Sequence, residues 1–322
     1  MAIDQTGKPL VSVMIPTYNR AHTIRRAVDS ALAQTYRNIE ILITDDGSED
    51  DTLDILSEYN DSRIKIVRHQ TNKGITSARN TCFNNASGEW LCFLSSDDEL
   101  LPSAVETLIN IATVIDPEAD WIQCHMCDFK TGQNACGDAE SGRMELGFMP
   151  SGKQQTNESW YMISREGLGA DRFVEGLNTF ESEWQIRVIP RLTRYFLNET
   201  LYIYHTENED RVSLSYEKGT NAMSYYEQYA RLLDANPNYV RNRIKAGIGG
   251  SFQAVISLLE LNDDYQRAQT QYDIGIECGL KPEELRPPMV QDGPVHKVTM
   301  VAKRLIVKVL RAFHLKKKAP LE

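Results

Sequence analysis

Short apolar runs alternate with amphipathic segments through the first hundred residues of the chain. The runs have the length of strands, and they cover residues 10–15, 39–43, 63–68 and 90–94. Those at 10–15 and 90–94 have the content of buried strands, and the run at 63–68 alternates around Ile64, Ile66 and Val67. Between the first two runs, apolar residues recur at helical spacing from Ile24 to Leu32. Strands that alternate with helices in this way form parallel βαβ units with right-handed crossovers. The pattern therefore predicts an α/β fold with a mostly parallel open sheet.

Polar residues follow three of these runs where each predicted strand ends. They are Pro16-Thr17-Tyr18-Asn19-Arg20, Thr44-Asp45-Asp46-Gly47-Ser48 and Ser95-Ser96-Asp97-Asp98-Glu99. Open α/β sheets bind ligands at the carboxyl ends of their strands, so these loops are the candidate ligand site. Ser48 followed by Asp51 also has the spacing of a capping box, which predicts a helix from there to about Tyr59.

Asp97 and Asp98 are the most informative pair in these loops. Carboxylates at a strand end are hard oxygen ligands that suit Mg²⁺ or Mn²⁺ carrying a phosphate group. The alternative is a solvated acidic turn at the start of the helix that Pro102 begins, because acids favour a helix N-terminus.

Glycine-rich phosphate sites are excluded by the sequence. The chain has no G-x-x-x-x-G-K-[ST] loop, and the stretch 247–252 lacks the third glycine of a dinucleotide fingerprint and follows no predicted strand. The polar loops are therefore expected to carry the ligand chemistry.

Composition narrows the class of protein further. The net charge of −10 argues against a nonspecific nucleic-acid binder. Six cysteines in 322 residues do not form a disulfide framework, and Cys124, Cys127 and Cys136 are expected to be ordinary thiols rather than a zinc site. No apolar run reaches the ~18 residues of a membrane span, and residues 1–9 do not resemble a signal peptide. We therefore expect a protein of the cytoplasmic side.

Taken together, the loops resemble the nucleotide-sugar signature of family 2 glycosyltransferases. The motifs are 16–20, 45–48, Asn72-Lys73-Gly74, Ala78-Arg79-Asn80 and 95–98, and the resemblance runs nearly without gaps over residues 10–115. It implies the GT-A fold, with helices on both faces of the sheet, and inverting sugar transfer. Several ordered motifs together are more specific than any one of them.

The resemblance implies a set of donor-binding residues, which are Pro16, Tyr18, Asn19, Asp45, Asp46, Lys73, Arg79, Ser95, Ser96 and Asp97. Tyr18 would pack near the nucleobase, and Asp45 or Asp46 would accept the pyrimidine N–H, a role that suits a carboxylate. Arg79 would lie near the diphosphate. Asp46 could instead only shape its turn, and Arg79 could only pair with an acid.

Asp97 would be the metal-binding acid of the family's D-x-D motif, with Mn²⁺ or Mg²⁺ as the cofactor. Ser95 stands where the first acid of that motif usually lies, so the site offers less negative charge to the cation. Asp98 is therefore expected to help hold the metal. Residues 195–204 predict two short β-runs split at 198–200, and His205 follows them. His205 could approach the metal or diphosphate, or could be an ordinary structural histidine.

The resemblance also implies a catalytic base in the stretch Phe180-Glu181-Ser182-Glu183-Trp184. Counting back from Arg187 favours Glu181, with Glu183 second. The family's usual Glu-Asp pair is absent here, and an acidic first helical turn is the alternative.

Three regions are expected along the chain. Residues 1–216 form the catalytic domain, with 10–115 as the nucleotide-sugar half and 116–216 as the acceptor half. Residues 217–285 form a helical appendage for packing, acceptor placement or homo-oligomerisation, and 286–322 form a linker and a basic helix. That helix, 296–318, carries eight lysines and arginines and no acid. It predicts contact with an anionic membrane surface, hence a peripheral location at the inner face of the cytoplasmic membrane.

The function that follows is a metal-dependent, inverting hexosyltransferase. Its donor would be UDP-hexose or UDP-HexNAc, and its acceptor a hydroxyl on a lipid-linked glycan or surface-polysaccharide precursor. The alternatives are a non-catalytic nucleotide-sugar-binding or scaffold protein, favoured by Ser95, and a sugar nucleotidyltransferase, whose glycine-rich loop is missing here.

Overall fold

The computed structural model describes residues 7–131, 140–144, 159–175, 184–185, 187–205, 233, 256, 259 and 264–278. The chain divides into two compact units, Met1–Ser215 with Lys245–Gly249, and Tyr216–Ile244 with Gly250–Glu322. The domain boundaries expected at 216 and 285 remain predictions.

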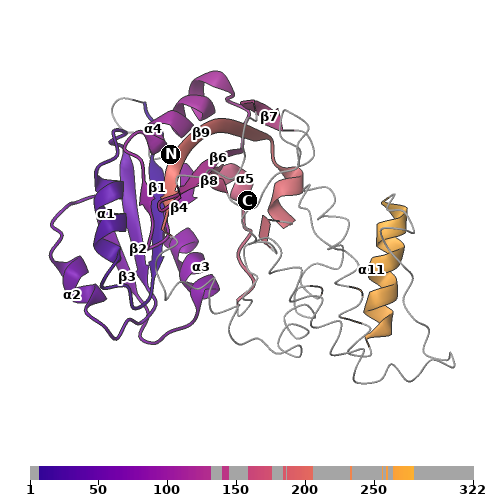
Figure 1. Ribbon diagram of the computed structural model, residues 1–322, viewed down its shortest axis with the longest axis horizontal. Helices are drawn as coiled ribbons and strands as arrows, with labels where there is room; N and C mark the ends of the chain where they lie inside the picture. The colour runs from indigo at the N-terminus through magenta and orange to yellow at the C-terminus, as the bar shows by residue number, and fades with distance from the viewer. Residues whose placement is uncertain are drawn as a thin grey trace. The chain divides into compact units, whose positions relative to one another are not determined.

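The first unit is built on a mixed sheet whose first four strands are parallel (Figure 1). They are β1 (Val11–Thr17), β2 (Ile39–Asp45), β3 (Ile64–Arg68) and β4 (Trp90–Phe93). The order across the described sheet is β3-β2-β1-β4-β8-β6-β9-β5. All four parallel strands were expected from the apolar runs, and the α/β fold class is confirmed.

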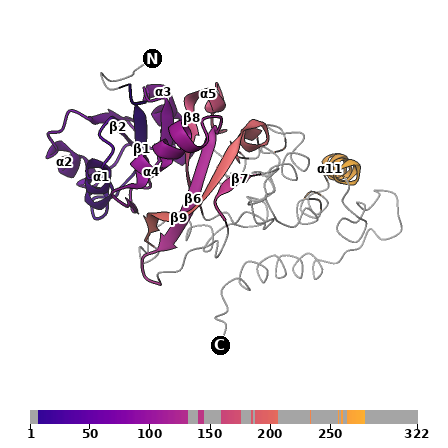
Figure 2. The ribbon, with the colours of Figure 1, turned by 90° about the horizontal axis from the view of Figure 1, so that it is seen from above.

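The second half of the sheet mixes directions. Its strands are β5 (Glu99–Leu100), β6 (Trp121–Asp128), β7 (Gly142–Met144), β8 (Ser159–Ser164) and β9 (Arg194–Tyr204). β8 is antiparallel to both β4 and β6, so β6 runs in the same direction as β4, and β9 is parallel to β6. Figure 2 shows β6 and β9 as two long neighbouring strands. The carboxyl ends of β1–β4, β6 and β9 therefore lie at one edge of the sheet.

Helices cover both faces of the parallel half (Figure 1). The helices of the first unit are α1 (Ile24–Leu32), α2 (Thr52–Ser57), α3 (Ile75–Asn85), α4 (Ala104–Asn110) and α5 (Arg165–Leu168), with a π-helical turn at Ile111–Ile115 and a 3₁₀ turn at Ile189–Arg191. The apolar stripe of α1 packs on Val11, Val13 and Ile15, which share one face of β1. α3 lies on the opposite face, where the Cys82 thiol contacts the Thr44 hydroxyl.

An aromatic cluster fills the core on the α3 side. It contains Phe83, Phe93, Trp121, Tyr161, Phe173 and Trp184. Trp121 stacks on Tyr161 with ring centroids 3.8 Å apart, and Phe173 meets Trp184 at 5.0 Å. Offset and edge contacts of this kind add to the apolar area that the rings bury.

Three local predictions were wrong. Pro16 does not close the first strand, because its nitrogen lies on the side of β4, where pairing with β1 ends at Met14. The runs expected on either side of 198–200 form the single strand β9, in which bulges opposite His125 absorb the extra residues. The capping box is absent: the Ser48 hydroxyl accepts from the Asn19 N–H, and Asp50 bonds to Thr52 at the start of α2.

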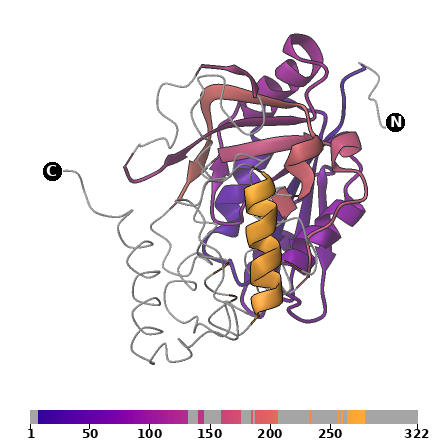
Figure 3. The same ribbon diagram turned by 90° about the vertical axis from the view of Figure 1, so that its right-hand side faces the viewer.

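The described part of the second unit is dominated by helix α11 (Tyr265–Glu277), shown along its length in Figure 3. The Asp264 side chain caps it by accepting from the Arg267 N–H, and Ala268, Gln271 and Gly275 are its buried residues. This helix lies within 217–285, where a helical appendage is predicted. The basic helix predicted at 296–318 lies outside the described residues, and no helix within the described ranges is long and apolar enough to cross a membrane.

Candidate active site

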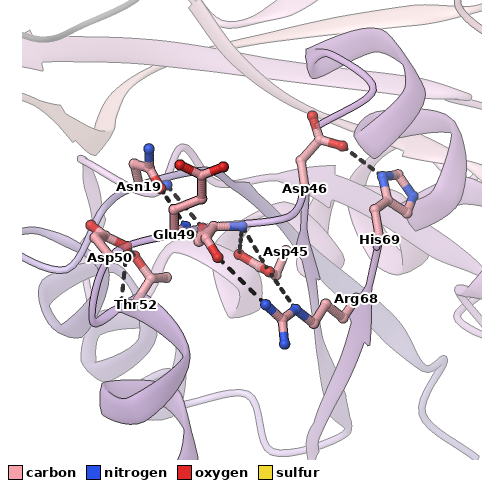
Figure 4. Close-up of polar contacts among 9 residues, drawn as sticks. Asn19, Asp45, Asp46, Glu49, Asp50, Thr52, Arg68 and His69 are labelled. Carbon is pink, nitrogen blue, oxygen red and sulfur yellow. Dashed lines mark hydrogen bonds and ion pairs between the residues drawn. The ribbon is translucent and has the colours of Figure 1, made fainter. Parts of the chain in front are cut away.

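The loops after β1 and β2 are bonded to each other at the carboxyl edge of the sheet (Figure 4). The Asn19 N–H donates to the Ser48 hydroxyl at 2.9 Å, and the Asn19 side-chain oxygen accepts from the Glu49 N–H at 2.9 Å. Asn19 adopts a positive φ of 50°, which asparagine tolerates better than most residues. Asn19 thus joins the two loops, while the neighbouring Tyr18 is 37% exposed beside them.

Asp45 ends β2 and lies buried under the same loop. Both of its carboxylate oxygens are within 3.3 Å of the Ser48 N–H, and Arg68 Nε lies 3.6 Å from Oδ2. A carboxylate offers about four acceptor sites, so these contacts leave capacity for one more donor. The Arg68 side chain, which makes this ion pair with Asp45, is 57% exposed.

Asp46 is bonded in a different way, as a clamp between three elements, and Figure 4 shows its contact with His69. Its Oδ1 accepts from the Lys73 N–H at 2.9 Å and its Oδ2 from the Gly74 N–H at 2.8 Å. His69 Nδ1 lies 2.6 Å from Oδ1, and His69 Nε2 lies 2.8 Å from the Thr81 hydroxyl on α3. The carboxylate therefore ties the end of β2 to the end of β3 and to the start of α3.

The backbone next to Asp46 packs closely against the backbone of residues 71–72. Gly47 has a φ of +78°, and a Cβ there would lie 2.7 Å from the carbonyl carbon of Thr71. Only glycine fits both the conformation and this approach. The contacts around Asp46 favour the turn-shaping alternative for this residue, which leaves Asp45 as the better candidate for the nucleobase.

We predict that Asp46→Asn lowers the free energy of unfolding by about 2–3 kcal/mol. Either orientation of the new amide turns an NH₂ group towards one of two backbone N–H groups, leaving that donor unsatisfied. Urea unfolding checks this, with Asp54→Asn on the exposed face of α2 as the matched control. Equal stability of the two variants would show that the clamp contributes nothing.

Arg79 lies on α3 with its guanidinium over two aromatic rings. Its carbon Cζ is 4.7 Å from the centroid of Phe93 and 5.5 Å from that of Phe173. The next residue, Asn80, bonds to both the N–H and the C=O of Phe173 at 2.9 Å, which fixes the ring below the arginine. Cation–π contacts of this kind hold the cation in place without neutralising its charge, so Arg79 remains suited to a phosphate group.

The loop after β4 is held by partners on three other elements. The Arg26 guanidinium on α1 donates to the Asp97 carbonyl oxygen. Tyr202 on β9 donates its hydroxyl to Asp98 Oδ2 at 2.6 Å, and the His205 N–H donates to Oδ1 at 2.9 Å. Ser95 takes part as well, since its N–H donates to the Tyr202 oxygen and its side chain bonds to Asp98.

These contacts give Asp97 and Asp98 different environments. Burial, together with the charge of the neighbouring Asp97, raises the pKa of Asp98 to about 7. Asp98 is 1% exposed and both of its oxygens have protein donors, whereas Asp97 is half-buried. The half-buried Asp97 is therefore the better candidate for a cation, and the contacts of Asp98 favour holding the loop.

His205 is oriented by Glu99 and by an aromatic ring. Its Nε2 lies 3.0 Å from Glu99 Oε1, and the ring of Phe129 stacks on the imidazole at 4.4 Å. The side chain is 3% exposed. This arrangement favours the structural alternative for His205, although its contact with Asp98 keeps it beside the candidate cation position.

The donor set fits a cation that the ligand itself helps to hold. Within the described residues, no group of three or more His, Cys, Asp or Glu side chains is arranged to bind a metal. Mg²⁺ and similar ions are commonly held by one or two carboxylates plus substrate phosphates rather than by a complete protein cage. Asp97 at the carboxyl edge of the sheet, with a diphosphate supplying further oxygens, matches that arrangement.

The remaining predicted residues divide by position. Pro16 and Ser96 are buried at the strand ends, and Lys73 is exposed. Glu181 and Glu183 lie outside the described residues, although Trp184, which directly follows them in sequence, is fully buried in the aromatic cluster. Their assignment remains a prediction.

Sequence reasoning missed four residues that support the site. Arg26 bonds to Asp97, and His69 bonds to Asp46. The ring of Phe173 contacts Arg79, and Tyr202 bonds to Asp98. His69 directly follows a predicted strand at the ligand edge, and that position was the available signal. The other three approach from elements distant in sequence, where no local pattern marks them.

Comparison with known proteins identifies one domain of the chain. Residues 12–160 match the family model described as Glycosyl transferase family 2. The chain carries a family 2 glycosyltransferase domain. The matched segment includes every strand-end loop of the candidate site from Pro16 to Asp98.

The curated relatives match over only part of this chain. A UDP-Glc:alpha-D-GlcNAc-diphosphoundecaprenol beta-1,3-glucosyltransferase of Escherichia coli is 43% identical over 102 residues, which is 32% of this chain and 40% of that protein. The alignments with the leading curated relatives span only 36% to 40% of their own length.

Solved structures resemble this chain in fold over a larger share of its length than the curated relatives cover. The TarS protein of S. aureus in complex with UDP-GlcNAc superposes with a TM-score of 0.62 at 20% identity, over 82% of this chain and 83% of that one. A mannosyltransferase of Pyrobaculum calidifontis in complex with GDP-Man and Mn²⁺ gives 0.54 at 17% identity, over 88% and 79%. At these identities the likeness concerns the fold, which is GT-A-like as predicted.

Proposed function

We propose that the protein is an inverting hexosyltransferase that moves a sugar from UDP-glucose or a related UDP-sugar to a hydroxyl of a lipid-linked glycan. The observation that carries the proposal is the set of polar loops at one sheet edge, where Asn19, Asp45, Arg79 and Asp97 come from four separate elements within a matched family 2 domain. The acceptor is proposed from the E. coli relative named for GlcNAc-diphosphoundecaprenol.

The donor would lie along the carboxyl edge in the order of the strands. Tyr18, 37% exposed after β1, offers a ring face for a nucleobase, and Asp45 after β2 offers an acceptor for a pyrimidine N–H. Arg79 and Asp97 lie further along, on α3 and after β4, where the diphosphate would be. In this proposal the anomeric carbon would lie near Asp97.

The nucleoside diphosphate gains negative charge as the glycosidic bond breaks. Arg79 is fixed on two rings before the donor arrives, so it stabilises that charge without reorganising. Mn²⁺ or Mg²⁺ held by Asp97 would supply Lewis-acid stabilisation of the same oxygens. Glu181 or Glu183 would accept the proton of the attacking hydroxyl from the opposite side of the anomeric carbon. Attack opposite to the leaving group gives inversion.

The decisive test is transfer measured with purified protein. We expect release of UDP from UDP-glucose in the presence of Mn²⁺ and a GlcNAc-diphospholipid, with a β-linked disaccharide as the product. An α-linked product would exclude the inverting mechanism. Binding of UDP-glucose with neither hydrolysis nor transfer would instead favour a non-catalytic binding protein.

We further propose that residues 296–318 bind anionic membranes and bring the protein to its lipid-linked acceptor. Each basic side chain near such a surface contributes ~1 kcal/mol, and the segment carries eight with no acid. Truncation after Pro294 should sharply reduce co-sedimentation with vesicles containing anionic lipid. A salt concentration of 0.5 M should do the same to the full chain, because added salt shortens the distance over which charges attract, which is ~8 Å at physiological salt. Equal sedimentation of both forms would refute the proposal.

A further inference from the structure

Phe129 is an exposed aromatic residue at the ligand edge of the sheet. It is 61% exposed, against 37% for Tyr18, the other exposed aromatic ring within the described residues. It directly follows β6, and its N–H donates to the Tyr204 carbonyl oxygen at 2.9 Å. An aromatic ring exposed at this edge offers a ligand an apolar face to stack on.

One face of the Phe129 ring is supported by the protein. The ring stacks on the His205 imidazole with centroids 4.4 Å apart and an interplanar angle of 26°. His205 is itself fixed by Glu99 and by the bond from its N–H to Asp98. A ring held in this way loses little conformational freedom on binding a ligand, because phenylalanine has only two side-chain torsions.

The order of the strands gives the ring its place relative to the donor. The nucleobase loops follow β1 and β2, Asp97 follows β4, and Phe129 follows β6, in the sheet order β2-β1-β4-β8-β6. Because β6 runs in the same direction as β4, all these ends lie at one edge. Phe129 therefore lies beyond β4 from the nucleobase loops in the strand order, and His205 connects it to Glu99, two residues after Asp97. An acceptor that attacks the anomeric carbon must approach from a part of this edge that the donor does not occupy.

We propose that Phe129 is the platform on which a pyranose ring of the acceptor glycan stacks. The inference rests on the proposed function for its acceptor and adds the residue that recognises it. A pyranose presents a face of C–H groups, and the negative face of an aromatic ring attracts such groups while excluding water from them. Asp98 and His205, directly behind the platform, connect its position to the loop that carries Asp97.

The test compares Phe129→Ala and Phe129→Trp with the wild type, and uses Val114→Ala, an exposed apolar truncation on the π-helical turn, as the matched control. Binding of the methyl α-glycosides of glucose, galactose and N-acetylglucosamine is followed by saturation-transfer NMR with UDP present. We expect Phe129→Ala to weaken binding about five- to tenfold, the effect of losing one aromatic contact, and Phe129→Trp to retain it. Acceptor KM should rise to the same extent while donor KM is unchanged.

The outcomes separate this inference from the proposed function. The platform is overturned if no glycoside receives saturation from the wild type, if Phe129→Ala binds as the wild type does, or if only undecyl phosphate, a lipid probe without sugar, depends on Phe129. A protein that binds glycosides through Phe129 but never turns over UDP-glucose keeps the platform and loses the proposed function. A protein that transfers sugar equally well with and without the ring keeps the function and loses the platform.

Discussion

Replacing Asp97 with asparagine is expected to lower the rate of sugar transfer by at least about 10²–10³-fold. The carboxylate is the half-buried acid at the end of β4, and its neighbour Asp98 already accepts bonds from Tyr202 and His205. Asparagine keeps the shape of the side chain and removes the charge that would hold a divalent cation against the diphosphate. The loop should survive, because Arg26 bonds to the Asp97 backbone carbonyl, which the substitution leaves in place.

Two measurements check this expectation. Calorimetric titration with UDP should show Mn²⁺-dependent binding in the wild type and in the exposed control Asp54→Asn, and none in Asp97→Asn. The substitution should also lower the pKa of Asp98, since the Asp97 charge is one cause of its elevation to about 7. Full transfer by Asp97→Asn, or by the wild type in EDTA, would show that Asp97 does not act through a metal.

Replacing the catalytic base is expected to have an effect of similar size on turnover alone. Glu181→Gln should lower kcat by about 10²–10⁴-fold and leave UDP affinity nearly unchanged, because a general base acts on the acceptor proton and not on the donor. Glutamate is ionised at neutral pH, with an unperturbed pKa of ~4.3, so it needs no special environment for this task. The prediction comes from the sequence, since both acids of the pair lie outside the described residues.

The comparison of Glu181→Gln with Glu183→Gln locates the base within the pair. An acid that only favours the helix N-terminus would cost about 0.3–1 kcal/mol of stability when replaced and would leave turnover intact. Glu166→Gln, an exposed substitution on α5, is the matched control for melting temperature and rate. Loss of activity only in Glu183→Gln would assign the base to Glu183 instead of Glu181. Wild-type rates in both variants would place the base elsewhere.

The sequence determined the parallel half of the fold and the location of the ligand edge. Four strand-like runs with helical segments between them allow few topologies, because parallel strands need crossover connections and these crossovers have one hand. The structure accordingly contains β1–β4 near the expected positions, and the polar residues after β1, β2 and β4 lie at one edge. Local pattern was sufficient there because each element and its loop are contiguous in the chain.

Tertiary structure decided the use of each polar side chain. Asp45 and Asp46 are adjacent and chemically identical, yet one keeps acceptor capacity and the other is committed to Lys73, Gly74 and His69. Asp97 and Asp98 separate in the same way, because Tyr202 and His205 arrive from a strand a hundred residues later. Hydrogen bonds and desolvation depend on which groups converge in space, and neighbours in sequence alternate in direction, so no spacing rule could have distinguished the members of either pair.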